Sequence, residues 1–213
     1  MNTMEPMQAL LRPLRALRRA VRRRRSLREL SALMQRHPRR VIVGAGATCM
    51  DGWVSTDRDS IDLLDANTWL RHMPEASLDA IFAEHVWEHL TEAQGRQAAR
   101  VCARFLRRDG YLRVAVPDGH HPDPAYLMHV RPGGTGSGAD DHKVLYTAET
   151  LAAVFLDAGF EVRHYEHFGA DGRFHFEPFD PMQGLVRRSR RFDPRNAGGR
   201  LAYTSIVLDA IKR

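Results

Sequence analysis

Hydrophobic positions along the chain follow two different periods, and the two alternate. Short apolar runs predict strands at residues 41–43, 53–56, 78–83, 111–116, 160–168 and 201–211. Apolar residues at helical spacing predict helices at 8–36, from Thr91 to about Arg107, and from Thr147 to just before Gly159. Segments 118–143 and 169–200 show neither period, and we expect them to form loops.

Strands that alternate with helices indicate an α/β protein built on a mostly parallel sheet with helices on both faces. In such sheets, ligands bind beyond the carboxyl ends of the strands. The chemistry is therefore expected just after Val43, Thr56, Ala83 and Val116.

Composition places the chain among globular proteins. Hydrophobic residues make up 43% and charged residues 27%, which excludes a disordered chain. No apolar run approaches the roughly 20 residues of a membrane helix, and the N-terminus lacks the apolar core of a signal peptide, so we expect a cytoplasmic protein. The cysteines, Cys49 and Cys102, form no spaced pair, which argues against a disulfide framework or a cysteine-based zinc site.

Positive charge is concentrated at the N-terminus. Residues 1–40 hold twelve arginines against two glutamates, a net charge of +10, whereas the whole chain carries +6. We therefore predict a basic helical extension over 1–38 and a second unit over 39–213. Three interpretations of the extension stay open: a solvated or partner-packed helix, an interfacial helix on the anionic inner membrane face, and a polyanion-binding arm. Residues 1–40 contain no aromatic side chain for base stacking, which disfavours nucleic acid.

The first predicted strand ends in a glycine turn, Gly44-Ala45-Gly46, and the second ends at Asp57. Glycines let the backbone turn sharply near a ligand, and a carboxylate can accept the hydroxyl protons of a ribose. A nicotinamide dinucleotide site needs a third glycine, where Cys49 stands, and an acidic residue about 20 positions on. Asp57 comes earlier, so the spacing favours S-adenosylmethionine. An NAD(P)-dependent oxidoreductase and an ordinary tight turn stay open as alternatives.

Four segments together resemble a known family: residues 44–46, 52–57, 77–90 and 106–118 are similar to motifs of the small bacterial class I S-adenosylmethionine-dependent methyltransferases. The resemblance covers roughly residues 40–168 and returns at the last strand. It implies a Rossmann-like methyltransferase fold with an antiparallel last strand, S-adenosylmethionine as cofactor, and methyl transfer to an unidentified acceptor.

Site residues follow from the resemblance position by position. It implies that the loop 44–46 lies against the methionine part of the cofactor and that Asp57 holds the ribose. It further implies that Asp65 faces the adenine amino group, and that Glu84 and His85 border the sulfonium. The connection between the first two strands departs from the family pattern, because it is too short for a full crossover helix.

Histidines after the strands are candidates for a general base. Methyl transfer depends mainly on positioning, but a base helps when the acceptor carries a proton. We name His85, His120 and His142 as catalytic candidates, each of which also fits an ordinary loop histidine. The acceptor is expected to be a small molecule or a lipid- or glycan-linked one. A non-catalytic S-adenosylmethionine-binding module and a non-methyl reaction of the same cofactor stay open.

A competing motif runs from His85 to His89, which matches the His-x-x-Glu-His pattern of zinc peptidases. That chemistry needs both histidines on one helical face. Here His85 follows an apolar strand, off any helix that carries His89, so we expect no metal site from this motif.

Overall fold

The computed structural model describes residues 4–213, with side chains from residue 16 onward. Its α-helices are α1 (Met4–Leu33), α2 (Ala66–Leu70), α3 (Glu92–Phe105), α4 (Pro124–Val130) and α5 (Ala148–Leu156). Its strands are β1 (Arg40–Ile42), β2 (Val54–Ser55), β3 (Leu78–Glu84), β4 (Leu106–Pro117), β5 (Phe160–Phe168), β6 (Phe174–Phe176) and β7 (Ser205–Lys212). Short 3₁₀ helices are η1 (Trp87–His89), η2 (Ala139–Asp141), η3 (Pro181–Gln183) and η4 (Pro194–Gly199).

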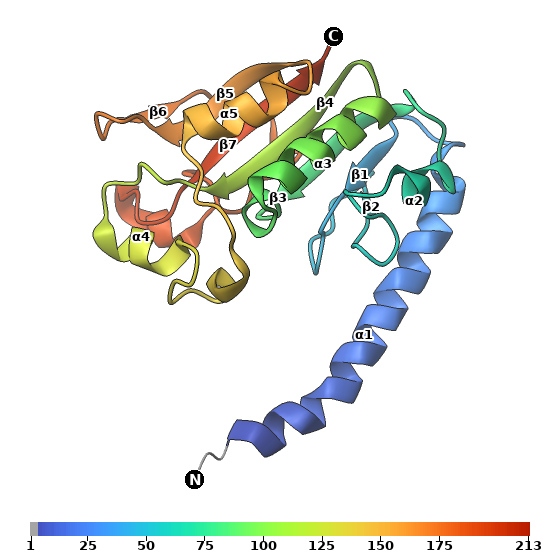
Figure 1. The fold of residues 1–213 in the computed structure, drawn as a ribbon, viewed down its shortest axis with the longest axis horizontal. Helices are drawn as coiled ribbons and strands as arrows, with labels where there is room; N and C mark the ends of the chain where they lie inside the picture. The colour runs from blue at the N-terminus through green and yellow to red at the C-terminus, as the bar shows by residue number, and fades with distance from the viewer. Residues whose placement is uncertain (1–3) are drawn as a thin grey trace.

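All the strands form one sheet in the order β2-β1-β3-β4-β7-β5-β6 (Figure 1). Strand β1 pairs in parallel with β2 and β3, and β3 pairs in parallel with β4. The last strand, β7, is inserted between β4 and β5 and is antiparallel to both. The α/β class, the mostly parallel strand direction and the antiparallel last strand are therefore confirmed.

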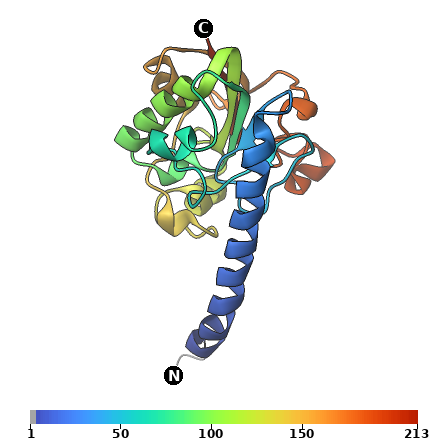
Figure 2. The ribbon, with the colours of Figure 1, turned by 90° about the vertical axis from the view of Figure 1, so that its right-hand side faces the viewer.

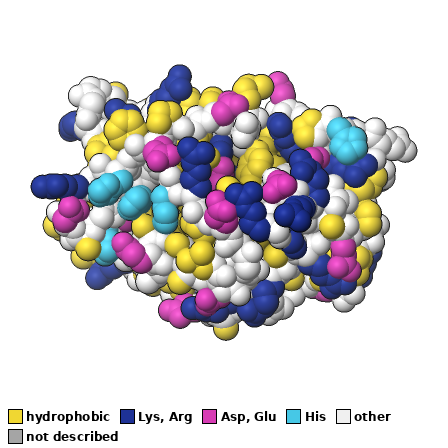
Figure 3. All heavy atoms as spheres, turned by 90° about the horizontal axis from the view of Figure 1, so that it is seen from above, with side chains coloured by type: hydrophobic (Ala, Val, Ile, Leu, Met, Phe, Trp, Pro, Cys, Tyr) yellow, Lys and Arg dark blue, Asp and Glu magenta, His cyan; other side chains and the backbone are white. Residues whose placement is uncertain are grey.

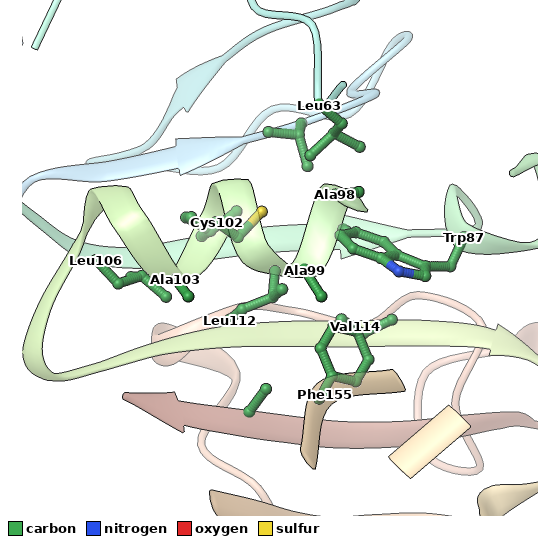
Figure 4. Close-up of a cluster of buried hydrophobic side chains, with 14 of the residues drawn as sticks. Leu63, Trp87, Ala98, Ala99, Cys102, Ala103, Leu106, Leu112, Val114 and Phe155 are labelled. Atoms are coloured by element: carbon green, nitrogen blue, oxygen red, sulfur yellow. The ribbon is translucent and has the colours of Figure 1, made fainter. Parts of the chain in front are cut away.

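One face of the sheet carries the larger core. Side chains alternate along β3, so Ile81 and Ala83 point to this face, where α3 and α5 pack. Figure 4 shows Trp87 and Phe155 meeting beside α3, and their rings lie 5.4 Å apart. Cys102 of α3 is buried in the same cluster, as a small hydrophobic residue.

The opposite face is covered differently. Phe82 and Val207 point to it, and the segment 177–199, which includes η3 and η4, adds Phe179 and Val186. Helices therefore lie on both faces, but those on this face are 3₁₀ turns. The short connection between β1 and β2 leaves no room for an α-helix, and a later part of the chain covers the exposed apolar surface instead.

Helix α1 begins and ends a few residues before the predicted bounds of 8–36. Its C-terminal part joins the core through Leu30 and Leu33, and Ser26 donates a hydrogen bond of 2.6 Å to the Ser55 carbonyl. Its N-terminal half projects away from the rest of the molecule, as Figures 1 and 2 both show. Within the described residues, no helix combines the length and the hydropathy needed to cross a membrane.

Two boundaries differ from the sequence prediction. Helix α3 starts from a capping box at Thr91 but stops at Phe105, and the predicted turn at 108–110 lies within β4. Leu78 of β3 pairs with Leu106 of β4, and Ala80, two residues later on β3, pairs with Tyr111, five residues later on β4. The extra residues of β4 therefore form a bulge. The segments expected to be loops also contain α4 and β6, both shorter than a periodic pattern can reveal.

Candidate active site

A cleft of about 590 Å³ opens where β1 and β3 end, which is the place expected for a ligand in a parallel sheet. We call it the main cleft. Its lining combines the turn after β1, the segment after β2, the η1 region and the loop before α5. The lining residues are Gly44, Arg58, Ile61, Asp62, Leu63, Leu64, His85, Val86, His89, Leu90, Gln94, Asp141 and Lys143.

Gly44 packs closely against the Val86 side chain in the wall of this cleft. Its φ of +59° lies in the left-handed region, and a Cβ there would stand 2.7 Å from Cγ2 of Val86. Gly46 has a similar φ of +53°, but no heavy atom lies within 4 Å of the position a Cβ would take. The two glycines therefore differ: Gly44 is required by conformation and by space, and Gly46 by conformation alone.

Five of the cofactor residues expected from the sequence line one of two cavities. Gly44 and His85 line the main cleft. Ala45, Gly46 and Asp57 line a smaller cavity of about 120 Å³, which the arginine-rich helix α1 borders. Asp57 Oδ1 accepts a 2.8 Å hydrogen bond from the Gly46 backbone, so this carboxylate holds the glycine turn in shape.

Asp65 and Glu84 lie outside the main cleft. Asp65 is exposed and caps α2 by accepting a hydrogen bond from Asn67. Glu84 accepts a 2.7 Å hydrogen bond from the Arg188 backbone, because its position on β3 directs it to the opposite face. The carboxylates that the structure brings to the main cleft are Asp62, three residues before Asp65, and Asp141. Asp62 was not among the residues expected from the sequence, and the signal for it was its place in the same segment after β2 as Asp65.

His85 stands at the turn that ends β3. Its φ is +56°, and its side chain is 11% exposed at the wall of the main cleft. Nδ1 lies 2.9 Å from a carboxylate oxygen of Glu88, and Nε2 lies 3.1 Å from the Ser205 hydroxyl. A hydrogen on Nδ1 faces the Glu88 carboxylate, and in that tautomer Nε2 is the acceptor.

Glu88 is a buried carboxylate, 1% exposed. Burial acts to raise its pKa, but His85, the local backbone and His89 together hold the pKa below its ordinary value, so the group is an anion at neutral pH. Its backbone carbonyl accepts a 2.6 Å hydrogen bond from Lys143. That bond ties the loop before α5 to η1, and it places His142 near Glu88 and His89.

The three candidate bases therefore separate. His85 and His142 both lie beside Glu88, from elements far apart in sequence. His120 lies elsewhere, with its Nδ1 3.9 Å from Glu149 at the start of α5, and it does not line the main cleft.

Comparison with known sequences matches part of the chain to a family. Residues 52–114 match a family model described as a methyltransferase domain, and this span contains β2, α2, β3, η1, α3 and most of β4. This part of the chain is therefore similar to methyltransferases. No curated protein sequence matches the chain.

Solved structures similar to this chain share little sequence with it. A possible histamine N-methyltransferase from Thermotoga maritima is 14% identical over 94% of this chain and 95% of its own, with a TM-score of 0.49. A methyltransferase from Archaeoglobus fulgidus is 14% identical over 91% and 94% of the two chains, with a TM-score of 0.48. The chain spans 36% of a third structure, titled "PigF with SAH", at 11% identity and a TM-score of 0.44.

Proposed function

We propose that the main cleft holds S-adenosylmethionine with the Gly44 turn against its methionine part, and that the methyl group passes to an acceptor beside His85. The supporting observation is that a turn too tight for any side chain opens on the same cleft as His85 and Asp62. The cleft volume of about 590 Å³ lies within the range usual for small-molecule sites.

The lining suits a nucleoside as well as an amino acid. Ile61, Leu63 and Leu64 supply apolar surface for a base. The Asp62 carboxylate accepts hydrogen bonds from the Leu64 backbone and from Arg58, and its remaining lone pairs can accept from an amino group. We assign the adenine amino group to Asp62 in place of Asp65. Asp57 lines the smaller cavity on the other side of the same glycine turn, and it accepts one hydrogen bond from Gly46. We assign its remaining acceptor capacity to the ribose hydroxyls, so the ribose is the part of the cofactor that must reach past the turn.

S-adenosylmethionine supplies an activated methyl group, so the protein must orient the acceptor and remove its proton. His85 suits the role of base, because Glu88 fixes its tautomer and an acceptor hydroxyl or amine can replace Ser205 at Nε2. His142 is the second candidate beside the same carboxylate. His120 receives no role in the transfer.

Calorimetric titration with S-adenosylhomocysteine tests the cofactor assignment, with NADH and NADPH titrated alongside. We expect micromolar binding of S-adenosylhomocysteine and none of the nicotinamides. Asp62→Ala should weaken S-adenosylhomocysteine binding at least about tenfold, because it removes one charge-assisted hydrogen bond. The matched variant Asp65→Ala should change the affinity less than about twofold. Preference for a nicotinamide would refute the function, and loss in Asp65→Ala alone would return the adenine to Asp65.

The projecting half of α1 supports a membrane-associated acceptor, lipid- or glycan-linked. Leu17 and Val21 are 62% and 60% exposed on a helix crowded with arginines, a composition suited to an anionic bilayer surface. The full chain should sediment with phosphatidylserine vesicles and not with phosphatidylcholine vesicles. Leu17→Glu with Val21→Glu should abolish sedimentation, whereas Leu156→Glu, an exposed leucine on α5, should not. Equal sedimentation of all three proteins would exclude this interface.

A further inference from the structure

Three side chains converge next to the wall of the main cleft, which His89 lines: Glu88 and His89 from η1, and His142 from the loop before α5. One ligand atom from each lies within 4.8 Å of the other two. The 2.6 Å backbone hydrogen bond from Lys143 to Glu88 holds the two segments together. The backbone, and not only the choice of side-chain rotamers, therefore brings these residues close.

Glu88 is the first indication that a cation belongs there. Among the residues whose side chains the structure describes, neither of its carboxylate oxygens has a partner in hydrogen-bond geometry, although His85 Nδ1 approaches to 2.9 Å. A fully buried carboxylate with this single close side-chain neighbour keeps unused acceptor positions, which is costly, and buried charges are usually paired or coordinate a metal.

His142 is the second indication. Its Nδ1 lies 2.6 Å from the Val130 carbonyl, so Nδ1 carries the hydrogen and Nε2 keeps its lone pair. Histidines that bind metals are typically held this way, with the other ring nitrogen donating to a carbonyl or carboxylate. His89 completes the set from the cleft wall, 4.8 Å from the His142 ring between centroids.

We propose that Glu88, His89 and His142 form a binding site for one divalent transition-metal ion such as Zn²⁺. Two imidazoles and one carboxylate suit zinc or iron and disfavour magnesium and calcium, which prefer oxygen ligands. Ligand atoms around tetrahedral zinc stand about 3.4 Å apart, so the side chains close by roughly 1 Å when the ion binds. Three protein ligands leave one coordination position open.

This ligand set differs from the zinc-peptidase motif in the sequence. His85 lies at the end of β3 and is not part of the set, and its Nδ1 lies 2.9 Å from a Glu88 carboxylate oxygen. In the proposed set, His142 takes the place that His85 has in the peptidase motif, and it comes from a segment more than 50 positions away in sequence. The site stands on this geometry alone, so its test is independent of the cofactor titration described above.

The experiment uses the full chain without a histidine tag, stripped with EDTA and titrated with Co²⁺. Tetrahedral or five-coordinate Co²⁺ gives visible absorption bands that hydrated Co²⁺ lacks, and Zn²⁺ should displace it. We expect one equivalent to bind with micromolar affinity or better. Glu88→Gln and His142→Ala should each weaken binding at least tenfold, and His175→Ala, an exposed histidine on β6, should leave it unchanged.

The control matters because other histidines gather on the surface. His167 and His175 stack at 5.1 Å, and Figure 3 shows histidine side chains grouped on one side of the molecule. Binding that is lost in His175→Ala, or kept in His142→Ala, would overturn the proposal, as would absence of saturable absorption. If Glu88→Gln fails to fold, His142→Ala with the Zn²⁺-induced rise in melting temperature as readout decides the question.

Discussion

Replacing Gly44 by alanine tests the central geometric claim about the main cleft. The backbone there has φ +59°, and the new Cβ would stand 2.7 Å from Cγ2 of Val86. Alanine in the left-handed region costs roughly 1–2 kcal/mol, and forcing a methyl into packed space costs roughly 1–3 kcal/mol more. Gly44→Ala should therefore lower the free energy of unfolding by about 2–5 kcal/mol.

Gly46→Ala is the matched control. It has nearly the same φ, +53°, and open space around the Cβ position, so it should lose only the conformational part, roughly 1–2 kcal/mol. The difference between the two variants then measures the contact with Val86. Adding Val86→Ala to Gly44→Ala should recover part of the loss, because the double mutant removes the overlapping methyl.

Urea unfolding followed by circular dichroism measures these free energies, and titration with S-adenosylhomocysteine measures the cleft. Gly44→Ala should also weaken cofactor binding, because Val86 must move and it forms part of the cleft wall. If Gly44→Ala and Gly46→Ala lose equal stability, or if Val86→Ala brings no recovery, the close approach at Gly44 does not exist and the reasoning is wrong.

Two further predictions concern buried polar groups. Arg113, 1% exposed, donates two 2.8 Å hydrogen bonds to Asp209. Arg113→Met should lower the free energy of unfolding in urea by about 3–5 kcal/mol, because it leaves the buried Asp209 charge unpaired. An equal loss of stability in the double mutant Arg113→Met/Asp209→Leu would contradict that cause. His121 donates from Nε2 to the Leu201 carbonyl and accepts at Nδ1 from the Asp123 backbone, and burial lowers its pKa below 6.5. Because the folded pKa is the lower one, this stabilisation is complete above about pH 6.5 and is lost as pH falls through the folded pKa, which NMR titration of the ring would show; titration at or above 6.5 would disprove it.

Local patterns predicted much of the fold correctly. The apolar run that includes Ile81, Phe82 and Ala83 predicted a strand, which the structure confirms. Thr91 and Thr147 marked helix starts, and the structure shows a capping box at each. These signals depend on nearest neighbours along the chain, so they can be read without knowing the tertiary structure.

The ends of helices and strands, and the segment that covers the second face of the sheet, were harder to predict from the sequence. The bulge in β4 depends on its register against β3, and the cover of the second sheet face comes from the distant segment 177–199. The sequence shows that this segment is irregular, but it does not show which apolar surface the segment meets. Arg113 illustrates the same point, since its partner Asp209 lies 96 positions later.

The candidate site divides in the same way. The sequence by itself determined the glycine turn at 44–46, the acidic end of the next strand and the turn at His85, because each depends on a strand ending where its apolar run ends. Only the tertiary structure decided that Asp62 lines the main cleft while Asp65 caps a helix, and that His142 joins Glu88. Distances between side chains from separate segments follow from how loops close over the sheet, and the spacing of residues along the chain does not encode them.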